Sequence, residues 1–149
     1  MFLLFVGPDE NHSLMEEVSE EELKCVLQSF QKDKIPGPDG WLIEFFMELY
    51  DMLGQDLLQV VEDTRTTGRI PACFNSTFIA LIPKVENPLL LNDFKPISLC
   101  NCIYKVVSKV ITNRFKQVLS EHSSNEQFGF LEGRLIHEAI GWLGRAYIA

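Results

Sequence analysis

The chain has 149 residues and a formal net charge of −8 at pH 7, and 46% of its residues are hydrophobic. This apolar content excludes an intrinsically disordered chain and indicates one folded domain, or part of a larger one. The apolar start MFLLFV is too short to span a bilayer and has no basic segment before it, so we expect no signal peptide and no membrane helix.

The charge is divided unevenly along the chain. Residues 1–72 contain 15 acidic and 5 basic residues, whereas residues 73–149 contain 6 and 8. We predict a single partial domain over residues 1–149, with an acidic helical part (1–72) followed by a part (73–149) that can bind nucleic acid locally. The overall pI of about 4.8 argues against binding through the general field of the molecule.

The first part of the chain is expected to be helical. Ser19 and Glu22 have the S-x-x-E form of a capping box, and apolar residues then recur at helical spacing up to Phe30. The segment 34–40, KIPGPDG, contains two prolines and two glycines, which predicts a shaped turn whose simplest role is connection. Two further helical patterns follow and are closed by Gly68.

Two short apolar segments, 77–82 and 94–99, are predicted to pair as an antiparallel hairpin between residues 75 and 102. The β-branched and aromatic composition of the first segment is typical of a strand buried on both faces. Lys84 and Lys95 would then come to one end of the sheet. They are either a clamp for a polyphosphate or nucleic-acid backbone, or two unrelated surface lysines.

The most regular periodic pattern runs from residue 103 to residue 119, where apolar residues form one helical stripe. Lys105, Lys109 and Lys116 fall on the opposite face. This face is either an ordinary solvated surface or a line of ammonium groups that follows phosphates.

The four cysteines and three histidines have no spacing that would make a metal site. We therefore expect reduced thiols in an intracellular protein of the nucleus or cytoplasm, not a secreted one, and no structural zinc.

Four motifs in order carry a resemblance to a known family: KIPGPDG (34–40), FIALIPK (78–84), DFKPISLCNCIYKVVSKVITNRFK (93–116) and EQFGFLEGRLIHEAI (126–140). Over roughly residues 16–140 the chain resembles the N-terminal part of a reverse transcriptase of the non-LTR (LINE-type) retrotransposon family. The resemblance implies the fingers and the start of the palm of an RNA-directed DNA polymerase, and an α+β, predominantly helical fold with a small antiparallel β-hairpin.

The resemblance also implies roles for particular residues. Lys84 would lie near the triphosphate of the incoming nucleotide, and Lys95 stands where the family usually has arginine. Lysine offers a point charge rather than a planar fork, so this departure weakens a bidentate clamp. Gln127 and Arg134 match a region of the family that faces the template-primer. With Lys105 and Lys109 they are the candidate nucleic-acid contacts.

Polymerases of this kind use two Mg²⁺ ions held by aspartates. In the family these aspartates lie downstream of the Gly-Arg region, and the last aspartate here is Asp93. We therefore predict no catalytic residues, no metal site and no Mg²⁺ cofactor in this chain, and no polymerase activity for it alone.

Three hypotheses for its function remain open. The chain is a catalytically incomplete retrotransposon fragment, a residual nucleic-acid-binding module, or an acidic helical module for protein interaction. The family implies a template-primer of RNA or DNA and a deoxynucleotide as partners. Apolar surface left exposed by the absent palm would promote self-association.

Overall fold

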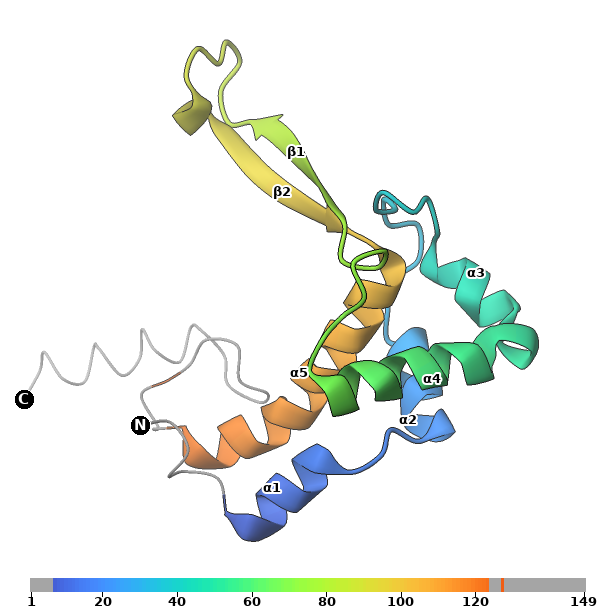
Figure 1. Cartoon of the computed structure of the whole chain (residues 1–149). Helices are drawn as coiled ribbons and strands as arrows, with labels where there is room; N and C mark the ends of the chain where they lie inside the picture. The colour runs from blue at the N-terminus through green and yellow to red at the C-terminus, as the bar shows by residue number, and fades with distance from the viewer. Residues whose placement is uncertain (1–6, 124–126, 128–149) are drawn as a thin grey trace, which may run out of the picture. The chain divides into compact units, whose positions relative to one another are not determined.

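The structure, a computed structural model, describes residues 7–123 and 127. Figure 1 shows the order of its elements. The helices and strands are α1 (Pro8–Met15), α2 (Glu20–Gln28), α3 (Ile43–Glu48), α4 (Tyr50–Thr67), β1 (Thr77–Pro83), the 3₁₀ turn η1 (Leu91–Asp93), β2 (Phe94–Cys100) and α5 (Cys102–His122). This arrangement confirms an α+β, mostly helical fold with a two-stranded antiparallel sheet.

The chain divides into two compact units. The larger comprises residues 17–110 and contains α2, α3, α4, the hairpin and the first part of α5. The smaller contains α1 and the second part of α5 from residue 111. Within it, the Arg114 guanidinium donates hydrogen bonds to the carbonyl oxygens of Leu14 (3.2 Å) and Glu16 (2.6 Å). The prediction of a single partial domain over the whole chain stays a prediction.

The predicted helices form, and their ends have the expected causes. The Ser19 hydroxyl accepts the backbone N–H of Glu22 at 3.1 Å, which caps α2. Gly68 ends α4 with a left-handed φ of 65°, which a residue with a side chain adopts only at a cost. The polar segment before Ser19, which carried no helical expectation, contains α1.

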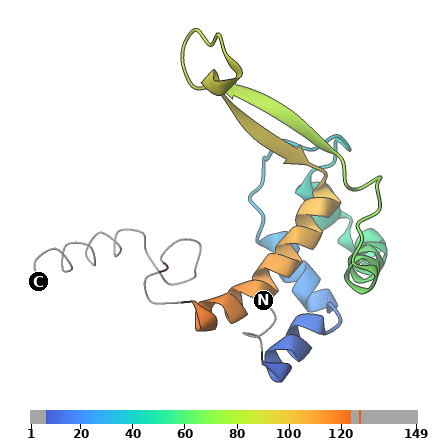
Figure 2. The same cartoon turned by 60° about the vertical axis from the view of Figure 1, so that its left-hand side comes forward.

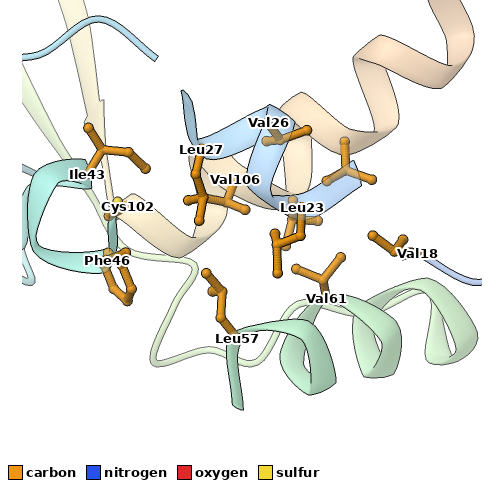
Figure 3. Close-up of a cluster of buried hydrophobic side chains, with 12 residues drawn as sticks. Val18, Leu23, Val26, Leu27, Ile43, Phe46, Leu57, Val61, Cys102 and Val106 are labelled. Carbon is orange, nitrogen blue, oxygen red and sulfur yellow. The ribbon is translucent and has the colours of Figure 1, made fainter. Parts of the chain in front are cut away.

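The core of the larger unit is formed by apolar side chains from four helices. Leu23, Val26 and Leu27 of α2 are almost completely buried, at 0–1% exposed, because they occupy one face of that helix. They pack with residues of α3, α4 and α5 (Figure 3). The cluster comprises Val18, Leu23, Val26, Leu27, Ile43, Phe46, Leu57, Val61, Cys102, Val106, Val107 and Val110.

The hairpin forms with the predicted pairing, in a register that runs from Thr77 opposite Cys100 to Pro83 opposite Phe94. The prediction that β1 is buried on both faces is wrong. Ile79 is 67% exposed and Phe78 58% exposed. Figures 1 and 2 show why: the two strands lead away from α2, α3 and α4, so no helix of this unit covers either face.

In the part of the chain that the structure describes, no helix is both long enough and apolar enough to cross a membrane.

Candidate nucleic-acid interface

Lys84 and Lys95 lie together at the outer end of the hairpin. Ile82 is paired with Lys95, and the backbone N–H of Lys84 donates to the Asp93 carbonyl at 2.7 Å, which extends the ladder by one residue. Residues opposite each other in an antiparallel pair share a face, as do residues two apart on one strand. Both lysines therefore lie on one face as diagonal neighbours, with Cβ atoms about 7 Å apart. Their predicted meeting at one end of the sheet is confirmed.

The loop between the two lysines is held by its own hydrogen bonds. One carboxylate oxygen of Asp93 accepts the backbone N–H groups of Leu89 and Leu90, both at 2.9 Å. These bonds lower the pKa of Asp93, so its carboxylate is ionised at neutral pH. The Lys84 ammonium donates to the Asn92 carbonyl at 3.0 Å. A phosphate at this end would thus meet two ammonium groups beside one carboxylate that is already occupied.

Lys105 and Lys109 lie elsewhere, on the first turns of α5. The Lys105 ammonium donates to the Ile35 carbonyl at 3.4 Å, and the Lys109 ammonium lies 5.7 Å from the centre of the Phe30 ring. At about 3.3 Å per residue, the strand from Lys95 to Cys100 alone is roughly 17 Å long. The four predicted lysines therefore form two pairs rather than one continuous line.

Gln127 is exposed in the structure. Arg134, with Phe128, Gly129 and Gly133, lies outside the described residues. The predicted role of this region beside a template-primer stays a prediction.

The KIPGPDG segment is more than a connection, because it holds the junction between β2 and α5. Asp39 accepts the backbone N–H of Cys102 with its carboxylate (3.1 Å) and donates its own N–H to the Asn101 side-chain oxygen (3.1 Å). Gly37 lies so close to this junction that a Cβ atom there would be 2.4 Å from the Cys100 carbonyl oxygen. Asparagine directly before a helix was a usable capping signal, but its partner could not be read from the sequence.

A cavity of about 570 Å³ opens beside this junction. The sequence did not point to it, because its walls come from segments far apart in the chain. Residues of the KIPGPDG segment, α2, α3 and α5 line it, among them Lys34, Trp41, Lys105 and Lys109.

The acidic residues do not form a metal site in the described part of the chain. No group of three or more His, Cys, Asp or Glu side chains is placed to hold an ion in residues 7–123 and 127. Asp51, Asp56 and Asp63 on α4 are exposed, as predicted. This donor set does not fit a two-metal polymerase centre.

No protein-family model matches the chain. Over 120 residues it is 33% identical to a protein of Xenopus laevis, the Transposon TX1 uncharacterized 149 kDa protein. The matched part is 80% of this chain and 9% of that protein, so the chain spans only a small part of its relative's length. The similarity connects the chain with a transposon protein, in agreement with the retrotransposon origin that its motifs suggest.

Proposed function

We propose that this chain is the fingers and early palm region of a LINE-type reverse transcriptase, and that it contacts a nucleic-acid backbone or a nucleotide triphosphate through the outer end of its hairpin. The observation that carries the proposal is the placement of Lys84 and Lys95 as diagonal neighbours on one exposed face. The similarity to a transposon protein supports it.

The chemistry at this end of the hairpin is electrostatic. Two fixed ammonium groups reduce the repulsion between successive phosphates and release bound counterions, so binding should weaken as salt increases. Lysine provides charge without the bidentate geometry of arginine, so we expect modest affinity and no base preference from this pair. The net charge of −8 further limits binding to the local field of the hairpin.

The proposal assigns no catalytic step to this segment. The exposed aspartates of α4 do not fit a two-metal site, so the Mg²⁺ chemistry of the family would have to use residues outside those described.

The exposed hairpin favours self-association as a second role. Ile79 and Leu81 share one face of β1 and are 67% and 50% exposed. Apolar surface of this kind on a two-stranded sheet is usual at contacts between chains.

Binding of a fluorescent single-stranded RNA, followed by anisotropy, tests the main proposal. The variant Lys84→Glu/Lys95→Glu should lose at least tenfold in affinity. The variant Lys24→Glu/Arg69→Glu makes the same change of net charge on α2 and after α4, and should bind like the wild type. Equal losses in both variants would show a general charge effect and contradict the proposed contact.

A further inference from the structure

The cavity beside the start of α5 combines positive charge with an accessible aromatic ring. Its volume of about 570 Å³ lies in the range usual for small-molecule sites, which is about 300–1,000 Å³. All of its walls belong to the larger unit of the chain. The residues that matter for the inference are Phe30, Lys34, Trp41, Glu44, Lys105 and Lys109.

The charged side chains leave the cavity with an excess of positive charge. Lys34, Lys105 and Lys109 contribute three ammonium groups. The opposing carboxylate is that of Glu44, one oxygen of which accepts the Asp33 backbone N–H at 2.7 Å. This bond lowers the pKa of Glu44, so its charge is present at neutral pH. Three cations against one anion, which is already hydrogen-bonded, favour an anionic ligand.

The ammonium groups keep donors for a ligand. Lys105 makes a single long hydrogen bond to the Ile35 carbonyl (3.4 Å), although an ammonium group has three donors. Lys109 is held over Phe30 by a cation–π contact, which uses none of its N–H groups in a conventional hydrogen bond. Both cations are thus positioned by the protein without being neutralised.

Trp41 supplies the aromatic surface. Its ring packs on Phe45, with centroids 4.2 Å apart and planes inclined by 31°, and the residue is still 48% exposed. An indole that is fixed on one side and open on the other can stack a planar base, which is worth about 1–3 kcal/mol per base in single-strand binding proteins.

We propose that this cavity binds one nucleoside monophosphate unit, with the base against Trp41 and the phosphate among Lys34, Lys105 and Lys109. The inference rests on the proposed function, since it explains how the second lysine pair contacts nucleic acid. It adds Lys34 and Trp41 to the binding residues and separates this site from the hairpin.

The fluorescence of Trp41 gives a direct test. The chain has two tryptophans, so a Trp142→Phe background leaves Trp41 as the reporter. Adenosine monophosphate should quench it with saturation, and Lys34→Glu/Lys105→Glu should weaken binding at least tenfold. The Lys24→Glu/Arg69→Glu control should bind as tightly as the background protein. No saturable quenching, or quenching unchanged by the pocket variant, would overturn the proposal.

Two further ligands define the source of the nucleotide and guard against misfolding. An eight-residue oligoadenylate that binds more than tenfold tighter than the mononucleotide would show that the site accepts a unit of a strand; equal affinity would assign it to free nucleotide. Inorganic phosphate should compete with the mononucleotide, and adenosine should bind more weakly than it. Adenosine that binds as tightly would contradict the phosphate contact without any variant.

The two proposals can fail separately. RNA binding that depends on Lys84 and Lys95, with no nucleotide effect on Trp41, would remove only the cavity site. Nucleotide binding at Trp41, with RNA affinity insensitive to the hairpin lysines, would remove only the hairpin contact.

Discussion

The Asp39 carboxylate accepts a hydrogen bond of 3.1 Å from the backbone N–H of Cys102, although the two residues are 63 positions apart in the chain. The Asn101 side chain completes the connection, because it accepts the Asp39 N–H and donates to the Cys73 carbonyl, each at 3.1 Å. One acidic side chain of the KIPGPDG segment therefore caps α5 and anchors the base of the hairpin together. The same junction forms one end of the proposed nucleotide cavity.

Replacing Asp39 should destabilise the larger unit. Asp39→Ala removes the acceptor for the Cys102 N–H at the first turn of α5, and loss of such a cap costs about 0.5–2 kcal/mol. Urea unfolding followed by circular dichroism measures the loss. The exposed aspartate Asp51 provides the matched control, and Asp51→Ala should change stability by less than about 0.5 kcal/mol. Equal effects of the two changes would contradict the capping role.

Two glycines of the same segment should respond differently to alanine. A Cβ on Gly37 would lie 2.4 Å from the Cys100 carbonyl oxygen, a backbone atom that can move only with the end of β2. A Cβ on Gly40 would meet nothing within 4 Å, but its φ of 72° is unfavourable for alanine. Gly37→Ala should therefore cost about 2–4 kcal/mol and Gly40→Ala about 1 kcal/mol. Thermal unfolding would measure both, and the reverse order would show that the junction is less tightly packed.

The sequence predicted local features well because their causes are local. The cap at Ser19, the end of α4 at Gly68 and the pairing of the two strands follow from residue type and spacing. The exposure of β1 was missed because burial depends on which elements cover a strand, and its apolar composition is equally typical of a strand that is covered. The junction at Asp39 and the cavity were missed for a related reason: hydrogen bonds and walls between distant segments leave no periodic signal.

The buried thiol of Cys102 predicts a loss of stability at high pH. Burial, together with the charge of Asp39, raises the pKa of Cys102 from 9.0 to about 12. The folded state therefore keeps its proton where the unfolded state loses it, so this contribution is intact below pH 9 and declines between pH 9 and 12. At pH 10 the loss should be about 1.4 kcal/mol.

Unfolding free energies of the wild type and of Cys102→Ala, measured from pH 8 to pH 10.5, isolate this effect because all other groups titrate in both proteins. The wild type should lose stability more steeply. Parallel curves would show that the Cys102 thiolate forms as easily in the folded chain as in the unfolded one.

The exposed face of β1 should control association of the chain with itself. Ile79→Lys/Leu81→Lys places two charges on that face and should shift sedimentation at high concentration toward the monomer. Leu89→Lys/Leu91→Lys changes equally exposed residues at the tip of the hairpin instead, and should leave association unchanged. A wild type that is monomeric at all concentrations would remove this role.

The salt dependence of RNA binding tests the central claim most directly. For a single strand, each phosphate contact contributes about 0.7 to the slope of log K against log salt concentration. Lys84→Glu/Lys95→Glu should therefore reduce the slope of the wild type by about 1.4 or more, and adding Lys105→Glu and Lys109→Glu should reduce it further. A slope that is the same in the wild type and in the variant with all four changes would contradict the proposed contact between these lysines and nucleic acid.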